Sequence, residues 1–239
     1  MLSSTAADQS RFAIHDACRE GKTVVVESLL NANPKLANRR DDDDRLPIHW
    51  AVSYSHMPIV KLLVQTKNFD VDEQDGSGWT PLMMAASLKD SDELVDLLIS
   101  RGADVNIKNN NGNTALHFTA SKSNLDIARK LVENKASARV KDKRGQLPLH
   151  RAAAAGSVPL IKLLLQAKSP ANATDIDGMT ALHHAIAEGH GDAAVELLKA
   201  GAEPDKKNSD GVIAIDLAPD AKIAQYIFHS AELEGIELA

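Results

Sequence analysis

Histidine is the side chain in this sequence best suited to chemistry, because the 239 residues include nine histidines and a single cysteine. Histidine serves as a general base and as a metal ligand. His183, His184 and His190 lie close together in the sequence, but their spacing matches no zinc motif and Cys18 has no second cysteine to join it. We therefore expect neither a zinc site nor a catalytic histidine.

Carboxylates gather at one point, in the run Asp41 to Asp44. Such a run could attract a cation, but it lacks the glycine and the distal glutamate of a calcium loop. A solvated turn explains it better. The sequence also contains no glycine-rich phosphate loop, no G-x-S-x-G elbow and no Cys/His pair. We expect no catalytic residues, no cofactor and no metal, and hence a protein that is not an enzyme.

The spacing of the histidines indicates their role. One position of a repeat, which we call the histidine slot, recurs at residues 15, 49, 83, 117, 150, 183 and 216. It lies in segments such as LPIHWA (46–51), TALHFT (114–119) and LPLHRA (147–152). A period of 33 or 34 residues with a T-P-L-H-x-A pattern is typical of ankyrin repeats. The predicted fold is an all-α ankyrin-repeat solenoid of seven helix-turn-helix units with short β-hairpin tips. We expect the slot imidazoles to bond neighbouring backbone and hydroxyl groups, as His117 with Thr114.

The repeat period also sets the expected domain organisation. We predict a flexible leader over residues 1–10, an acidic tail over 230–239, and seven units between them, at about 11–44, 45–78, 79–112, 113–145, 146–178, 179–211 and 212–229. Asp216 replaces the slot histidine in the last unit. Terminal repeats are atypical because they act as caps.

The fifth unit shows how each repeat should be built. Gly145 is expected at the hairpin tip, where φ is positive, and Asp44 takes this place in the second unit. Pro148 begins the inner helix, where a missing N–H does no harm. Leu149, Ala152 and Ala153 form a thin apolar face for helix stacking. Leu160, Ile161, Leu163, Leu164 and Leu165 are predicted to form the buried stripe of the outer helix.

Charge changes sign along the chain. Residues 1–120 carry a net charge of −5, residues 121–172 of +8 and residues 173–239 of −9. A nucleic-acid-binding protein would show one continuous basic stripe, so we expect a protein partner with alternating charges; chance variation is the alternative. No apolar run reaches the length of a membrane span. With one cysteine, the sequence suits a reducing compartment, and we expect a monomer in the cytoplasm and nucleus.

The hairpin tips and the ends of the inner helices should be free to bind a partner, since solenoids bind along their concave face. The candidate partner-binding residues are Asp43, Arg45, Tyr54, Trp79, Lys122, Lys143, Arg144 and Glu188. An exposed tryptophan is a frequent interface anchor, although Trp79 could instead pack over the adjacent tip. Trp50 follows the slot histidine, and we expect it in the core.

Several segments resemble the gankyrin family of seven-repeat proteasome assembly chaperones across nearly the whole chain. They are RLPIHWAVSYSH (45–56), GSGWTPLMMAAS (76–87), ALHFTASKSN (115–124), KDKRGQLPLHRAAAAGS (141–157) and AEGHGDAAVELL (187–198). The resemblance implies that the concave face binds the C-terminal helical domain of a proteasomal AAA ATPase subunit during assembly of the 19S regulatory particle. It places Asp43, Arg45, Trp79 and Lys122 at that interface, whereas Lys143 and Arg144 follow from the tip geometry alone.

One feature of that family is missing. Its Leu-x-Cys-x-Glu sequence, associated with retinoblastoma-type pocket proteins, corresponds here to residues 184–188, which keep only Glu188. We do not expect that second activity. The alternative function is an ankyrin-type signalling adaptor or kinase inhibitor that uses the same face.

Overall fold

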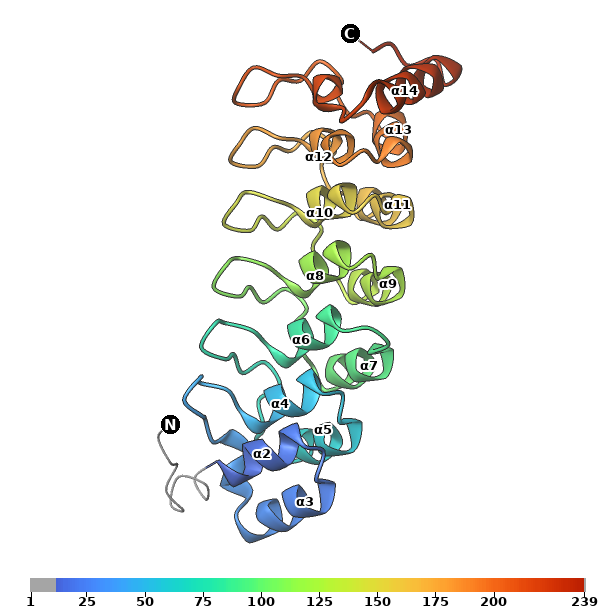
Figure 1. The fold of residues 1–239 in the computed structure, drawn as a ribbon. Coiled ribbons are helices and arrows are strands. Elements are labelled where there is room, and N and C mark those ends of the chain that lie inside the picture. The colour runs from blue at the N-terminus through green and yellow to red at the C-terminus, as the bar shows by residue number, and fades with distance from the viewer. Residues whose placement is uncertain (1–11, 239) are drawn as a thin grey trace. The chain divides into compact units, whose positions relative to one another are not determined.

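The computed structural model describes residues 12–238, which divide into two compact units, residues 12–110 and 111–238. Each unit consists of pairs of antiparallel helices joined by long hairpin loops (Figure 1). We describe each unit by itself.

The first unit contains three helix pairs and a 3-10 helix. The inner helices are α2 (Ala13–Arg19), α4 (Pro47–Ser53) and α6 (Pro81–Ser87), and they pack in a row. The outer helices are α3 (Thr23–Ala32), α5 (Met57–Val64) and α7 (Asp92–Ser100), with η1 (Pro34–Asn38) after α3. The hairpin loops lie on the side of the inner helices that faces away from the outer ones (Figure 1).

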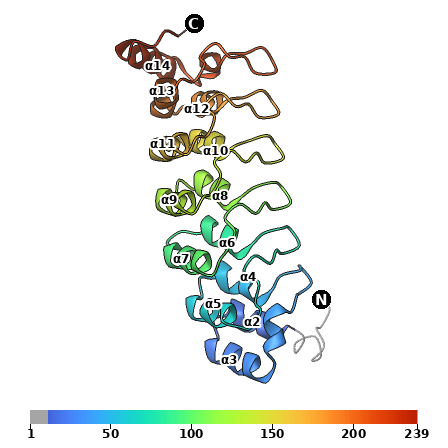
Figure 2. The ribbon, with the colours of Figure 1, turned by 180° about the vertical axis from the view of Figure 1, so that it is seen from behind.

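The second unit repeats this arrangement. Its inner helices are α8 (Ala115–Ser121), α10 (Pro148–Ala154) and α12 (Ala181–Ala187), followed by the 3-10 helix η2 (Ala214–Leu217). Its outer helices are α9 (Leu125–Glu133), α11 (Val158–Gln166), α13 (Gly191–Lys199) and α14 (Ala221–Leu233), which are seen from behind in Figure 2. The helices α8, α10 and α12 again stack directly on one another.

The ends of the chain refine the expected boundaries. The predicted leader over residues 1–10 lies outside the described residues. The seventh repeat was expected to end at His229. Helix α14 runs on to Leu233 because Ile227 and Ala231, one helical turn apart, are both fully buried. No helix in residues 12–238 is long and apolar enough to cross a membrane.

Packing in the fifth repeat follows the expected pattern, with one correction. Leu149, Ala152 and Ala153 are fully buried. In α11, however, Leu160, Ile161 and Leu164 form the buried stripe, while Leu163 and Leu165 are only half-buried. With about 3.6 residues per turn, Leu160, Ile161 and Leu164 point to one side of the helix, and residues 163 and 165 lie on either side of that face.

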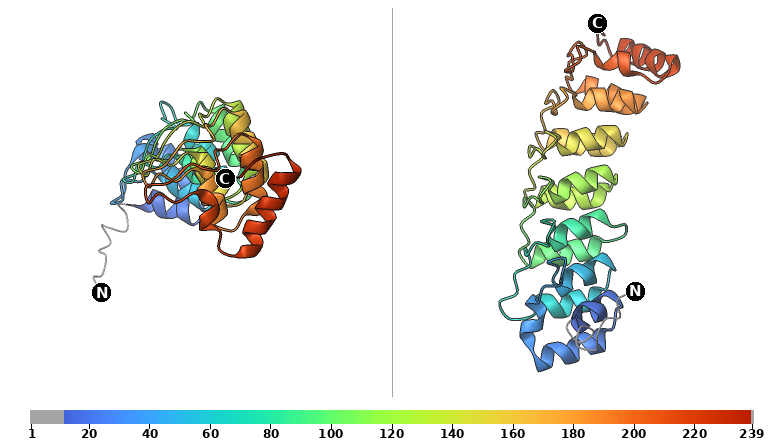
Figure 3. Two further views of the ribbon diagram at one scale, coloured as in Figure 1. Left: turned by 90° about the horizontal axis from the view of Figure 1, so that it is seen from above. Right: turned by 60° about the vertical axis from the view of Figure 1, so that its left-hand side comes forward.

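The hairpin tips are turns rather than strands. Among the described residues the only β-pairing is an isolated bridge between Lys207 and Ile213. Backbone bonds close five of the loops, for example from the N–H of Asp142 to the carbonyl of Gln146, at 2.9 Å. Within each unit the loops follow one side of the helices, as the right-hand view of Figure 3 shows.

The tip glycines meet two requirements at once. Gly78 has a φ of 78°, and a Cβ there would lie 2.7 Å from the backbone nitrogen of Asn110 in the next loop. Asp44 occupies the same place in the second repeat with a φ of 59°, as expected. A side chain is therefore tolerated only where the neighbouring loop leaves room.

Candidate protein-binding face

The slot histidines hold adjacent repeats together. In His150, Nδ1 accepts the N–H of Leu147 at 3.0 Å, and Nε2 lies 3.1 Å from the carbonyl of Ala173, just before the next hairpin loop. His49, His117 and His183 make the same pair of contacts. Burial lowers the pKa of His150 to about 4, so the imidazole is neutral and donates from Nε2. These histidines are structural, as their spacing predicted.

Aspartates fix the hairpin loops and face the inner helices. The Oδ1 atom of Asp142 accepts the N–H groups of Arg144 and Gln146, both at 2.9 Å. Asp41, Asp75 and Asp175 hold their loops in the same way. The second carboxylate oxygen of each points to a side chain on the face.

After three of the slot histidines, the next residue reaches that second oxygen. Trp50 Nε1 donates to Asp41 at 2.7 Å, Arg151 donates to Asp142 at 2.7 Å, and His184 Nε2 lies 2.9 Å from Asp175. Burial works against ionisation of Asp142, but the hydrogen bonds from Arg151 and the Gln146 N–H outweigh it and lower its pKa. This position therefore belongs to the face, not to the core.

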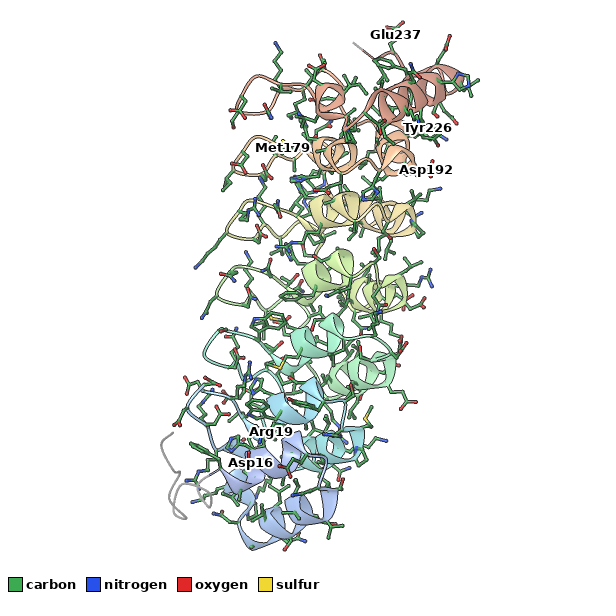
Figure 4. The ribbon with its side chains drawn as sticks, viewed as in Figure 1. Asp16, Arg19, Met179, Asp192, Tyr226 and Glu237 are labelled. Carbon is green, nitrogen blue, oxygen red and sulfur yellow. The ribbon has the colours of Figure 1, made fainter. Side chains whose placement is uncertain are left out.

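The expected core position of Trp50 is wrong. Its ring is half-buried, with the Arg45 guanidinium 4.9 Å and the Arg19 guanidinium 5.8 Å from its centre, and Tyr54 stacks at 6.5 Å. Guanidinium groups are attracted to the negative face of an indole ring. Arg19 is held in turn by Asp16, 2.9 Å away, and the two side chains are labelled in Figure 4. These residues form an aromatic–arginine cluster on the first unit.

Trp79 lies in a hollow beside that cluster. The hollow is lined by Arg45, Ser53, Asp75, Ser77, Trp79, Met84, Ser87 and Leu88. Trp79 is half-buried, and its backbone N–H donates to Oδ1 of Asp75. Arg45 Nε lies 3.4 Å from the buried carboxylate of Asp75. Both predicted residues thus share one hollow, and Arg45 also links two repeats.

The second unit has a polar hollow of its own. It is lined by Ser121, Arg144, Gln146, His150, Arg151, Ala154, Ala155, His184 and Glu188. Arg144 and Glu188, both predicted, are exposed there. Arg151 and His184 were missed by the sequence reasoning. They could have been found by comparing position 50 with its equivalents, which carry large side chains where a core would need small ones.

The remaining predicted residues are accessible, and Asp43 lines a further hollow on the first unit. Asp43 and Tyr54 are exposed on the first unit. Lys122 is exposed at the end of α8, and Lys143 is exposed on its hairpin loop. Neither lysine lines the polar hollow of the second unit. Within residues 12–238, no three histidine, cysteine or acidic side chains are grouped so that they could hold a metal ion.

The helix pairs, the linking histidines and the hairpin aspartates define an ankyrin-repeat protein. The family model described as ankyrin repeats in three copies matches residues 14–109, 63–142, 83–175 and 116–208, and the chain belongs to this family. A curated Saccharomyces cerevisiae protein, the probable 26S proteasome regulatory subunit p28, is 41% identical over 129 residues, 52% of this chain and 56% of that protein. This match confirms the resemblance drawn from the sequence.

Other similar proteins share the ankyrin repeats with this chain, and their names state no common role. The ankyrin repeat-containing protein C6C3.08 of Schizosaccharomyces pombe is 36% identical over 51% of each chain. The chain thus spans about half the length of these two fungal relatives. The ankyrin repeat domain of Bcl-3 has a TM-score of 0.75 at 25% identity, covering 90% of this chain and 97% of that one. Human ASB11, with a TM-score of 0.78 at 21% identity over 91% of this chain and 96% of its own, shows the fold alone.

Proposed function

We propose that this protein is a non-catalytic chaperone for the regulatory particle of the proteasome. In this proposal its hairpin loops and inner helices bind the C-terminal helical domain of one base ATPase subunit and escort that subunit during 19S assembly. The observation that carries the proposal is the 41% identity to a probable 26S proteasome regulatory subunit. The cytoplasm and nucleus are the compartments where we expect this activity.

The face has the composition that such binding requires. Trp79 and Tyr54 offer aromatic surface, and Arg45 and Arg144 offer guanidinium groups, the residue types enriched at binding hot spots. Acidic and basic groups are placed separately, with Asp43 on one loop and Lys143 on another. An ATPase domain with complementary charges would be oriented by them as it approaches.

The test is a direct titration. The full chain would be titrated calorimetrically with each purified base ATPase subunit in turn. We expect one subunit to bind with a dissociation constant of about 1 μM or tighter, which corresponds to about −8 kcal/mol. Binding to none of the subunits overturns the proposal. Recovery of a protein kinase instead, when the tagged chain is purified from cells, would favour the signalling alternative.

A further inference from the structure

A hollow between the first two repeats differs from the others because one of the side chains that line it has an unused hydrogen-bond acceptor. It is lined by Phe12, His15, Asp16, Arg19, Asp41, Asp42, Asp43 and Trp50. Among the residues that the structure describes, Nδ1 of His15 has no hydrogen-bond partner. His15 is only 3% exposed. A buried polar atom without a partner is uncommon in native proteins and calls for an explanation.

The local backbone explains why this atom is unused. In α10 the residue before the helix, Leu147, is extended with a ψ of 162°, and its N–H donates to Nδ1 of His150. Before α2 the equivalent residue, Phe12, has a ψ of 19° instead. Its ring packs edge-on against the His15 imidazole, with the centres 5.6 Å apart. The bond found in the other repeats is therefore not made in this one.

The chemistry of Nδ1 specifies what could fill the hollow. Nε2 of His15 lies 2.9 Å from the carbonyl of Arg39 and must carry the proton to donate to it. Burial lowers the pKa of His15, which keeps the ring neutral. Nδ1 is then a lone-pair acceptor, and only a donor can satisfy it.

The charge around the hollow indicates which kind of donor would bind there. Four aspartates and one arginine line it, so a cation is favoured over a neutral donor or an anion. Asp41 is already engaged by two backbone N–H groups and by Trp50, whereas the exposed Asp43 carboxylate makes no ion pair within 4 Å among the described residues. A planar guanidinium carries several N–H donors, so it could bond Nδ1 and a carboxylate together.

We propose that this hollow is a recognition site for an arginine side chain of a protein partner. The guanidinium donates to Nδ1 of His15 and pairs with the carboxylate of Asp43, beside the ring of Trp50. Arg19 and Arg45 already show that this ring accepts guanidinium groups. The site rests on the proposed function only for the identity of the protein that supplies the arginine.

The experiment observes His15 directly. The full chain, labelled with ¹⁵N-histidine, would be titrated with N-acetyl-arginine methylamide at millimolar concentration. We expect a saturable upfield shift of the His15 Nδ1 resonance, because that nitrogen gains a donor. The citrulline analogue has nearly the same shape but no charge, and it should produce a much smaller shift. No shift with the arginine probe, or an equal shift with citrulline, overturns the proposal.

Matched variants locate the ion pair. Asp43→Asn should weaken binding of the arginine probe by about threefold, as expected for one exposed ion pair. Asp44→Asn removes a neighbouring charge that does not line the hollow, and it should leave binding unchanged. Equal effects of the two variants would contradict a specific site. Arginine binding without any ATPase binding would refute the proposed function alone, and the reverse result would refute only this site.

Discussion

Trp50 and Trp79 are each partly packed against their repeats and partly accessible. Each tryptophan is half-buried, and each is tied to a hairpin aspartate, Trp50 through its indole nitrogen and Trp79 through its backbone. The indole bond of Trp50 restrains its ring, so this ring would lose little side-chain freedom on binding. The two rings therefore have the properties of interface anchors.

We expect Trp79→Ala to weaken binding of the ATPase subunit by about 2 kcal/mol or more, the usual threshold of a hot spot. Val24→Ala serves as the control, because Val24 is 78% exposed on the outer helix α3. Calorimetric titration measures binding, and urea unfolding measures stability. If Trp79→Ala binds normally but unfolds early, its ring has a packing role and not a binding role.

To test the role of Arg45 in binding, a neutral substitution is more suitable than a charge reversal. Its Nε lies 3.4 Å from the buried Asp75 carboxylate, so Arg45→Glu would place two carboxylates together and disturb the fold as well as the interface. We expect Arg45→Gln to weaken ATPase binding, with a smaller loss of stability than Arg45→Glu causes. Measuring both variants by titration and urea unfolding separates the two effects.

The slot histidines make stability depend on pH. The pKa of His150 is about 4 in the folded protein, against 6.5 without burial. As pH falls from about 6.5 to about 4, the unfolded chain takes up a proton that the folded chain does not, so stability decreases. The loss is roughly 3 kcal/mol for this histidine, because a pKa difference of one corresponds to about 1.4 kcal/mol.

Urea unfolding between pH 7 and pH 4.5 checks this expectation. His15, His49 and His183 also have lowered pKa values and add to the same trend. Asp142 and Asp175, whose pKa values are lowered too, contribute stability that is lost only at lower pH. A stability that stays constant over this range would contradict neutral buried imidazoles.

Among the elements, both helices of each pair contribute buried side chains to the core, and the inner helices also border the candidate binding face. In α11, Leu164 is fully buried and its neighbour Leu163 is half-buried. We expect Leu164→Ala to lower the free energy of unfolding by about 2–5 kcal/mol, the range for truncating a buried leucine. Leu163→Ala should cost clearly less, and neither should alter the ATPase interface. Equal losses in urea unfolding would mean that both positions are core.

The period of the sequence was enough to predict the helices, because each repeat meets the same packing requirement. It predicted structural slot histidines, and it gave Arg45, Trp79, Arg144 and Glu188 as candidate binding residues, which the structure places at hollows. It could not predict that Trp50, Arg151 and His184 reach the hairpin aspartates. That bond joins residues nine apart across a turn, so the helical spacing within one segment does not indicate it. The orphan acceptor of His15 depends on one backbone angle and was equally hidden.

For the molecule as a whole, the pattern of charge should govern the rate of association. The net charge changes from −5 to +8 to −9 along the sequence, and exposed charges are screened beyond about 8 Å in physiological salt. We expect the rate of association with the ATPase subunit to fall several-fold between low and high salt, while dissociation changes less. Stopped-flow measurements check this. A change of less than about twofold in the association rate would rule out steering by these charges.

The constant spacing between hairpin aspartate and slot histidine limits where the chain can accept an insertion. Asp41 and His49, Asp142 and His150, and Asp175 and His183 are each separated by eight positions, although the repeats themselves differ in length. Length therefore varies only outside this segment, and a foreign sequence should be accepted there. Gly201, after α13, has open space around the position of a Cβ. A short tag inserted after Gly201 should leave the protein folded, whereas the same tag after Gly145 should separate a histidine from its neighbouring loop and lower the melting temperature.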